Sequence, residues 1–424
     1  GVIVSPLLVP KGGKLTFQVG GGRGPDTYVA LCSANGKELQ TARGNDAEAM
    51  KRISWDLTAH AGKKLFLKIV DQRQKGWAHV TADNFQFDGK ILDEYPVLKN
   101  DAPAQKATAR PTPPGISKVP AAKPHNGQAE RLNFVVIFTD DQGYGDLGCY
   151  GSTNVHTPRI DRMTAEGMKL TSFYVAAPYC TPSRAALMTG SYPKRIGMAG
   201  GVLLSADKRG LNPSEETIAE TLKSVGYKTG MFGKWHLGDQ PEFLPTRQGF
   251  DEFFGLPYSH DIHPHNPKSN RRFPPLPLLE GEEVIELEPN ADLFTKRFTE
   301  RAVQFIERHK DHPFFLYVPH PIPHRPNHMT APFLDGVSDE VRKALAEEKA
   351  TGKINYAVRD KLYFRAVNEI DWSVGQILDA LKQQGIDDKT IVLFTSDNGQ
   401  ARPPVGIGSA GPLKGAKGMT WEGG

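Results

Sequence analysis

Residues 133–141 read Asn133-Phe134-Val135-Val136-Ile137-Phe138-Thr139-Asp140-Asp141, a run of large apolar residues that ends in two carboxylates. A continuous apolar run is typical of a strand that is buried on both faces of a parallel sheet. In open α/β sheets, ligands collect beyond the carboxyl ends of such strands. The segment therefore predicts a central parallel strand over 133–139 with a functional site at its end.

Further strand-like and helix-like segments alternate along the rest of the chain. The strand-like segments are Lys228–Phe232, Phe314–Val318 and Ile391–Thr395, and the helix-like segments are Thr157–Gly167, Ser183–Thr189, Ser214–Val225, Leu293–His309 and Asp360–Gln384. Within Ser214–Val225, the residues from Ser214 to Thr217 supply the expected N-cap and first-turn acids. The alternation predicts an α/β layered domain with a largely parallel sheet.

Asp397 and Asn398 close a strand-like run in the same way that Asp140 and Asp141 close the first one. Three carboxylates and an amide oxygen form a hard oxygen cage, which suits Ca²⁺ or Mg²⁺ rather than zinc. Such dense negative charge would be unfavourable without a counter-ion. Either pair alone is more simply a turn former that ends a strand. The two pairs together with Cys180 predict a metal site.

Cys180 opens the run Cys180-Thr181-Pro182-Ser183-Arg184-Ala185-Ala186-Leu187-Met188-Thr189-Gly190. By itself the run could be a turn with Pro182 at a first helical position. It also resembles the signature of type I sulfatases, Cys-x-Pro-Ser-Arg followed by a short helical stretch and Thr-Gly. In that family a separate maturation enzyme converts the cysteine to Cα-formylglycine. One hydroxyl of the hydrated aldehyde attacks the sulfur of a sulfate ester, and the other later expels sulfate.

The resemblance implies an alkaline-phosphatase-like fold and roles for several further residues. It implies that Ca²⁺ binds at the predicted cage, with the formylglycine oxygen of residue 180 as a further ligand. Arg184 would hold formylglycine in place and offset nearby negative charge. Ser259, in a stretch that looks like the arylsulfatase A branch, would lie near the sulfate.

Lys234 and His236 lie in Gly-Lys-Trp-His-Leu-Gly after a predicted strand. Residues two apart in an extended chain point the same way, so both side chains can face one anion. Taken alone, a solvated lysine beside a packing histidine would be the simpler interpretation. By the family motif, the lysine binds sulfate, and the histidine contacts the formylglycine hydroxyl and assists collapse of the hemisulfate.

His324 matches the family's active-site histidine, whereas His320 comes too early and would at most line the pocket. A histidine near neutral pKa can protonate the leaving alcohol oxygen. Lys417 aligns with the family lysine before Gly-x-x-x-Glu-Gly-Gly, which contacts the sulfate. Lys414 falls three residues earlier and is expected to support the loop.

Composition excludes several classes of protein. The 424 residues suggest two or three structural units, and the net charge of +4 is too balanced to argue for nucleic acid. We expect no membrane span, and no signal peptide opens the chain. Cys32 and Cys149 are expected to be buried free thiols, because three cysteines make no disulfide framework.

Three regions are expected along the chain. Residues 1–95 read as a small β-sandwich, with strands at Lys14–Val19, Thr27–Cys32, Lys64–Val70 and Ala78–Phe87, and resemble galactose-binding-like modules around Trp55 and Trp77. For Trp77, a packing role is the simpler alternative to sugar stacking. Residues 96–130 are Pro- and Ala-rich and predict an extended linker. Residues 131–424 form the predicted catalytic domain, whose C-terminal subdomain is expected to be missing, because the chain stops inside a family motif.

These observations predict a sulfuric-ester hydrolase that acts on a sulfated carbohydrate or an aryl sulfate and is exported from the cytoplasm. Two alternatives remain open. One is a phosphate or phosphonate monoester hydrolase on the same fold, because both anions are tetrahedral. The other is a catalytically silent glycan-binding protein, should Cys180 stay unmodified.

Overall fold

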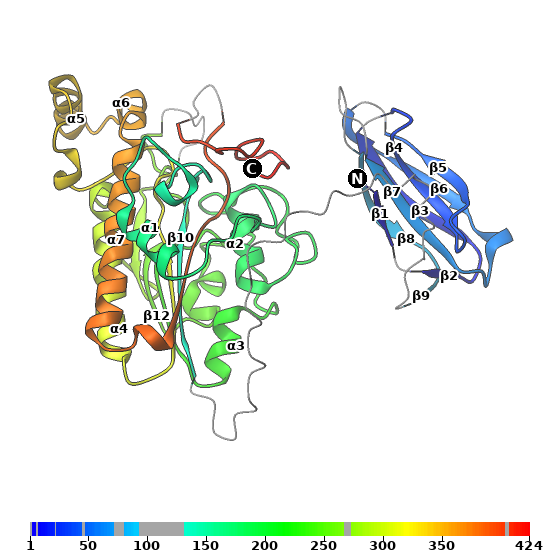
Figure 1. Cartoon of the computed structure of the whole chain (residues 1–424), viewed down its shortest axis with the longest axis horizontal. Coiled ribbons are helices and arrows are strands. Elements are labelled where there is room, and N and C mark those ends of the chain that lie inside the picture. The colour runs from blue at the N-terminus through cyan, green and yellow to red at the C-terminus, as the bar shows by residue number, and fades with distance from the viewer. Residues whose placement is uncertain are drawn as a thin grey trace. The chain divides into compact units, whose positions relative to one another are not determined.

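The computed structural model describes residues 2–5, 7–21, 23–44, 47–71, 80–92, 131–266, 273–402 and 407–424. It divides the chain into two compact units, residues 1–123 and 124–424 (Figure 1). The predicted linker 96–130 lies wholly outside the described residues. No helix in the described ranges is long and apolar enough to cross a bilayer.

The larger unit is built on a seven-stranded sheet in the order β14-β13-β12-β11-β15-β10-β16. Its strands are β10 (Asn133–Thr139), β11 (Lys228–Lys234), β12 (Glu252–Leu256), β13 (Pro277–Glu280), β14 (Glu283–Leu287), β15 (Phe314–Pro319) and β16 (Thr390–Ser396). The five strands from β16 to β12 run parallel, and β13 and β14 are antiparallel. The predicted α/β class is confirmed, with strands where the apolar runs indicate them.

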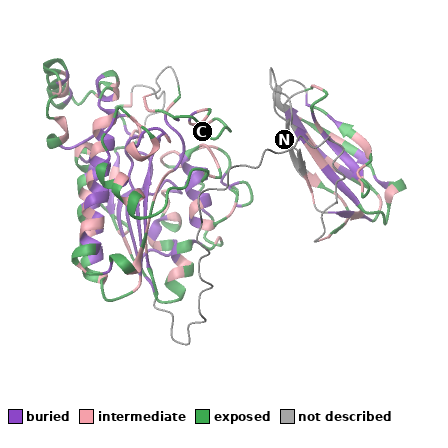
Figure 2. Cartoon of the chain, in the orientation of Figure 1, coloured by how far each residue is buried: buried purple, intermediate pink, exposed green. Residues whose placement is uncertain are grey.

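Helices cover both faces of this sheet (Figure 1). The helices of the larger unit within the described residues are α1 (Pro158–Glu166), α2 (Cys180–Thr189), α3 (Ile218–Ser224), α4 (Phe294–His309), α5 (Asp339–Thr351), α6 (Tyr356–Asp360) and α7 (Tyr363–Gln383), of which α5 and α6 lie away from the sheet. Val135 and Ile137 of β10 pack in the core shared with α4 and α7, whereas Val136 and Phe138 pack in the core shared with α2. Burial on both faces explains why the strand is apolar at every position from Phe134 to Phe138, and Figure 2 shows the sheet as buried throughout its centre.

Two helix starts differ from the sequence prediction. Helix α2 begins at Cys180 and not at Ser183, because a proline fits in a first turn, where its missing N–H needs no partner. Helix α3 begins at Ile218, four residues after Ser214. Its N-cap is Thr217, which closes a reciprocal capping box with Glu220.

The N-terminal unit consists of two antiparallel sheets. One sheet has the order β5-β4-β7-β2-β9 with β1 on β7, and the other has the order β6-β3-β8. The strands are β1 (Val2–Val4), β2 (Leu8–Pro10), β3 (Lys14–Gly21), β4 (Thr27–Ser33), β5 (Glu38–Ala42), β6 (Ala47–Asp56), β7 (Leu65–Asp71), β8 (Val80–Gln86) and β9 (Gly89–Ile91). Trp55 packs edge-on against Phe17 at 4.7 Å in the core between the sheets, so it is a packing residue. Trp77 lies outside the described residues.

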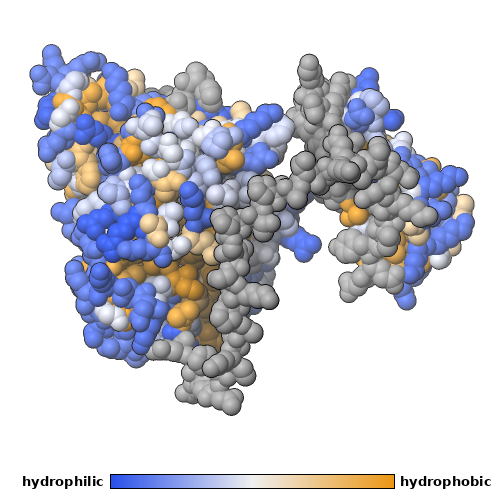
Figure 3. Space-filling view, in the orientation of Figure 1, coloured by the Kyte–Doolittle hydropathy of each residue, from blue (hydrophilic) through white to orange (hydrophobic). Residues whose placement is uncertain are grey.

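Strand β16 forms one edge of the large sheet within the part of the chain that the structure describes. Ile391 and Leu393 on this strand are each 42% exposed, and they line an apolar groove of about 820 Å³. Figure 3 shows hydrophobic side chains gathered on this face of the larger unit. An edge strand of this kind can accept a further strand.

Candidate active site

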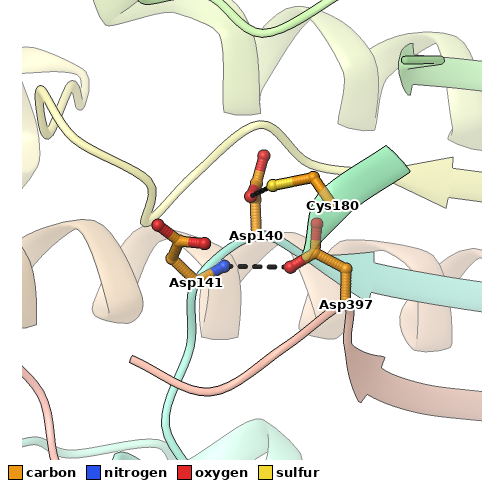
Figure 4. Close-up of side chains that lie close together, drawn as sticks. All are labelled: Asp140, Asp141, Cys180 and Asp397. Atoms are coloured by element: carbon orange, nitrogen blue, oxygen red, sulfur yellow. Dashed lines mark hydrogen bonds between the residues drawn. The ribbon is translucent and has the colours of Figure 1, made fainter. Parts of the chain in front are cut away.

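Four side chains from distant parts of the sequence meet at one end of the large sheet. Asp140, Asp141, Cys180 and Asp397 each offer a ligand atom, and these atoms lie within 4.8 Å of one another. All four side chains are buried, with at most 4% exposure. Figure 4 shows the carboxylates and the sulfur around one small volume. The predicted meeting of the two acidic pairs with Cys180 is thus a feature of the fold.

The backbone explains how these residues converge. β10 and β16 are neighbours in parallel register, with Thr139 opposite Ser396, so their carboxyl ends coincide. Asp141 adopts a left-handed conformation at φ 61°, and its N–H donates to Oδ1 of Asp397 at 3.2 Å (Figure 4). Cys180 lies in the first turn of α2, at the positive end of the helix dipole. Sγ of Cys180 is 3.3 Å from Oδ1 of Asp140.

Each of the three carboxylates has its own cation. Lys234, at the end of β11, donates to Asp140. Arg184 donates from Nε and Nη2 to Oδ2 of Asp397 at 3.1 and 2.8 Å. Lys417 donates to Oδ1 of Asp141 at 2.5 Å and lies 3.4 Å from Sγ of Cys180. The two lysines and the arginine thus offset the negative charge of the acidic cluster, as the resemblance implies for Arg184.

Burial and these charges move the acid strengths of the cluster in different directions. Burial alone would raise the pKa of Asp140, but Lys234, His324 and Arg184 hold it well below its usual range. The pKa of Asp397 is raised to about 6 by burial and by the charge of Asp140, against Arg184. Burial, together with Asp140 and Asp397, raises the pKa of the Cys180 thiol well above its ordinary value. An unmodified Cys180 is thus a neutral thiol, which is a poor nucleophile.

The donor set fits a hard divalent cation. Asn398 donates from Nδ2 to Oδ1 of Asp141 at 2.7 Å, and its Oδ1 is buried without a hydrogen-bond partner in the described structure. An orphaned amide oxygen beside three carboxylates is a ligand arrangement that Ca²⁺ accepts. No thiolate–imidazole set of the zinc type occurs among these residues. The residues Asp140, Asp141, Asp397 and Asn398 therefore suit a calcium or magnesium ion.

The histidines follow the sequence prediction in part. Nδ1 of His324 lies 2.7 Å from the Arg325 carbonyl, and Nε2 lies 3.6 Å from Oδ2 of Asp141. A carbonyl only accepts, so Nδ1 carries the hydrogen and Nε2 faces the cluster. His320 lies 3.1 Å from the hydroxyl of Ser373 on α7 and is fully buried there. His320 therefore packs against that helix and is not a lining residue of the open pocket.

His236 reaches the site by a different route from the one expected. Its φ of 63° shows that the chain leaves the extended conformation directly after Lys234, so strand alternation does not orient the histidine. Nε2 lies 2.8 Å from the Leu203 carbonyl, which leaves the buried Nδ1 without a partner among the described residues. Burial and the charges of Lys234 and Arg184 lower the pKa of His236 well below its ordinary value. The ring is therefore neutral, with a free acceptor at Nδ1.

The remaining predicted residues lie close to the cluster or beside its supporting loop. Ser259 is 3% exposed, and its buried hydroxyl has no hydrogen-bond partner among the described residues. Lys414 is exposed, with its ammonium group 3.6 Å from the ring centroid of Trp421. The structure also brings in His260 and Asp261, which directly follow Ser259. The contact between His260 and His324 could not be predicted, since no spacing rule links a turn at 260 to a loop at 324.

The cysteines outside the motif are unpaired thiols. Cys32 is buried, and Cys149 is only partly buried, so the expectation of burial holds fully for the first alone.

The arrangement combines a buried nucleophile position, a cation cage and several positive side chains, and comparison with known proteins defines its class. The family model described as Sulfatase matches residues 132–424, so the chain belongs to the sulfatase family. Human arylsulfatase A is 39% identical over 309 residues, which cover 69% of this chain and 57% of that protein. Human N-acetylgalactosamine-6-sulfatase is 37% identical over 321 residues, which cover 70% of this chain and 56% of that protein.

A solved structure of similar fold contains a carbohydrate. The structure of Ps i-CgsB in complex with k-i-k-neocarrahexaose is 34% identical, with a TM-score of 0.54, and covers 70% of this chain and 64% of that one. The expected resemblance to sulfatases is confirmed. The chain spans little more than half the length of the curated relatives named above. The family match begins at residue 132, so the galactose-binding-like character of residues 1–95 stays a prediction.

Proposed function

We propose that this protein hydrolyses sulfate monoesters with a formylglycine derived from Cys180. The observation that carries the proposal is the position of Cys180, in the first turn of α2 among three carboxylates and beside the ammonium group of Lys417. Sγ is the atom that maturation would replace with oxygen. A general esterase would need no such concentration of buried charge around its nucleophile.

The cationic side chains would bind the transferred group. A sulfate ester carries one negative charge spread over three oxygens. The ammonium group of Lys417 lies 3.4 Å from Sγ of Cys180, and Lys234 and Nε2 of His324 lie beside Asp140 and Asp141. Arg184 is fully buried and bonded to Asp397. It would therefore keep its contact with the cluster and orient Asp397, and it would not move to bind the substrate. Preorganised donors in a buried site stabilise developing charge without reorganisation during reaction.

Two histidines and one carboxylate would move the protons. As the sulfur–oxygen bond to the alcohol breaks, the imidazolium form of His324, which has a hydrogen on each ring nitrogen, would give the proton on Nε2 to the leaving oxygen. Asp397 would assist deprotonation of the attacking hydroxyl. The free Nδ1 of neutral His236 would accept a proton when the second hydroxyl later expels sulfate.

Two groups complete the chemistry. Formylglycine supplies a hydrated aldehyde with two hydroxyls, one for attack on sulfur and one for release of sulfate. Asp140, Asp141, Asp397 and Asn398 would hold a Ca²⁺ ion, which would supply positive charge near the sulfate, and Mg²⁺ is the less suitable ion.

We further propose that the substrate is a sulfated carbohydrate and that a formylglycine-generating enzyme matures the protein. The names of the relatives support the first point, since one acts on an N-acetylgalactosamine sulfate and another structure holds a carrageenan-type hexaose. A sulfated polysaccharide is an extracellular substrate, and we therefore propose export.

The test compares kcat/KM for 4-nitrophenyl sulfate and 4-nitrophenyl phosphate on matured protein with calcium. A sulfatase should prefer the sulfate by orders of magnitude. Preference for the phosphate would favour a phosphate or phosphonate monoester hydrolase, and mass spectrometry of the Cys180 peptide would reveal a silent, unmodified protein.

A further inference from the structure

A turn after β12 places polar side chains beside His324 that the proposed reaction does not use. The ring of His260 stands edge-on to that of His324, with centroids 5.7 Å apart and an interplanar angle of 81°. Nε2 of His324 is in turn 3.6 Å from Asp141. Because His324 is the proposed proton donor to the leaving oxygen, this turn borders the place where the alcohol of the substrate would lie.

Hydrogen bonds define which ring nitrogens of the turn remain available. Nε2 of His260 lies 3.0 Å from the Pro326 carbonyl, so it carries the hydrogen, and the buried Nδ1 is an acceptor without a partner in the described ranges. Nδ1 of His263 accepts from the N–H of His265 at 3.2 Å. Nε2 of His263 therefore carries the hydrogen of the neutral ring, and this donor is buried with no acceptor in the described structure.

Other histidines nearby are already engaged. His328 lies on another side of His260, with ring centroids 5.7 Å apart, and its Nδ1 is 2.7 Å from the carboxylate of Asp292. Asp292 also accepts from Arg359 at 2.6 Å. His328 thus has a partner nearby, whereas one ring nitrogen of His260 and one of His263 have none among the described residues. His260 and His263 are 3% and 6% exposed, and a buried donor or acceptor without a partner is costly unless a ligand or water completes it.

Asp261, between these two histidines, supplies a carboxylate. Its residue is partly exposed, and burial alone would raise its pKa, but His324 and His260 lower the pKa to about 2. The group is thus ionised under ordinary conditions. Its negative charge interacts with the charges of His324 and Lys234, and it also acts on His263, two residues further along the turn.

We propose, on the premise that the protein is a sulfatase, that Asp261 and His263 form a subsite for hydroxyl groups of the sugar that carries the sulfate. A sugar hydroxyl both donates and accepts, which matches a carboxylate paired with an imidazole N–H. Asp261 then determines specificity, since a leaving group such as a phenol, which has no hydroxyl besides the one that is released, cannot bind to it. The same negative charge disfavours a sugar ring with a second sulfate or a carboxylate beside the cleaved ester.

The experiment compares matured wild-type protein with Asp261→Asn on two substrates, 4-nitrophenyl sulfate and a monosulfated methyl galactoside. Loss of a hydrogen bond to a charged group should lower kcat/KM for the galactoside roughly tenfold or more, whereas the aryl sulfate should change less than about threefold. His263→Leu should show the same selective loss. His265→Asn, at an exposed position in the same turn, is the matched control and should change neither substrate.

A second readout uses a disulfated galactoside. Wild-type protein should discriminate against it, and Asp261→Asn should reduce that discrimination. An equal loss on the sugar and the aryl substrate would mean that Asp261 acts only through His324, and no loss on either would mean that the turn binds only water; both results overturn the subsite. If wild-type protein cleaves neither substrate, the proposed function fails. Calorimetric binding of the monosulfated galactoside then decides the subsite, with weaker binding to Asp261→Asn supporting it and equal binding overturning it.

Discussion

The ammonium group of Lys417 lies 3.4 Å from Sγ of Cys180, although 237 residues separate the two in sequence. Backbone contacts fix this approach. The N–H of Lys417 donates to the Gln400 carbonyl at 2.9 Å, and the N–H of Gly418 donates to the Pro178 carbonyl at 2.8 Å. Ser409, earlier in the same segment, donates its N–H to Asp146 at 2.8 Å. The loop that carries Lys417 is thus tied to both segments that carry the acidic and nucleophilic residues.

Lys417 should therefore matter far more than Lys414. Removing a well-placed charge from a buried site lowers kcat by about 10²–10³-fold, and we expect a loss of this size for Lys417→Ala. Lys414→Ala removes only an exposed contact with Trp421 and should stay within a few-fold of wild type. Steady-state kinetics with 4-nitrophenyl sulfate measure both. Equal losses would refute the alignment that assigns the sulfate contact to Lys417.

Cys180→Ala should abolish turnover and leave the fold intact, because the side chain contributes chemistry that no neighbour supplies. Unmodified protein, produced without a maturation enzyme, should be equally inactive, and its Cys180 should resist alkylation near neutral pH. The thiol is 1% exposed and its pKa is raised by burial, so little thiolate is present. Peptide mass spectrometry after alkylation provides the measurement, with Cys149, which is partly buried, as internal comparison. Substantial activity of Cys180→Ala would end the assignment.

The sequence predicts the sheet and the acidic ends of its strands well, for a physical reason. β10 and β15 are buried and β16 pairs along β10, and each of the three is a local apolar run that can be found without tertiary information. The residues at their carboxyl ends then converge by topology alone. This is why the apolar runs are enough to pair Asp140 with Asp397.

What the sequence could not predict depends on backbone conformation and on contacts between distant loops. The left-handed conformation at His236 breaks the alternation of side chains along an extended strand, and that alternation is what predicts the orientation of His236. The contact between His260 and His324 joins two loops from neighbouring parts of the sheet and follows no local pattern. The cations on the acidic cluster can be identified individually in the sequence, but their pairing with particular carboxylates emerges only from the fold.

Chelation should lower both activity and thermal stability, and calcium should restore them. A cation at a hundred times its dissociation constant stabilises the folded state by about 2.7 kcal/mol. The effect on stability should stay moderate, because Lys234, Arg184 and Lys417 already balance the three carboxylates. Differential scanning calorimetry with and without chelator, followed by calcium or magnesium, measures it. Identical melting curves and rates after exhaustive chelation would count against the cage.

The N-terminal unit should be dispensable for small substrates. Its hydrophobic core is separate from those of residues 131–424, and all candidate site residues belong to the larger unit. Removal of residues 1–128 should leave kcat/KM for an aryl sulfate within a few-fold. If the unit binds glycans, KM for a sulfated polysaccharide should rise instead. Loss of aryl sulfatase activity in folded, truncated protein would indicate that residues 1–128 complete the pocket.

Glu369 on α7 should make stability depend on pH near neutrality. The side chain is 1% exposed and accepts hydrogen bonds from the N–H and hydroxyl of Thr330, and burial raises its pKa to about 7 from an ordinary value of 4.5. Between these two values the folded state binds more protons than the unfolded state, so the free energy of unfolding falls as pH rises. The penalty is complete above pH of about 7 and amounts to about 3 kcal/mol at most.

Glu369→Gln removes this titration and keeps the hydrogen-bonding shape. We expect the variant to match wild type below pH of about 4.5 and to be more stable by up to about 3 kcal/mol above pH of about 7. Urea unfolding across this pH range measures the difference. Asp379→Asn, at an exposed position on the same helix, is the matched control and should leave the slope of wild type unchanged. Parallel pH profiles for wild type and Glu369→Gln would show that Glu369 titrates alike in both states, since a group with equal folded and unfolded pKa contributes no slope.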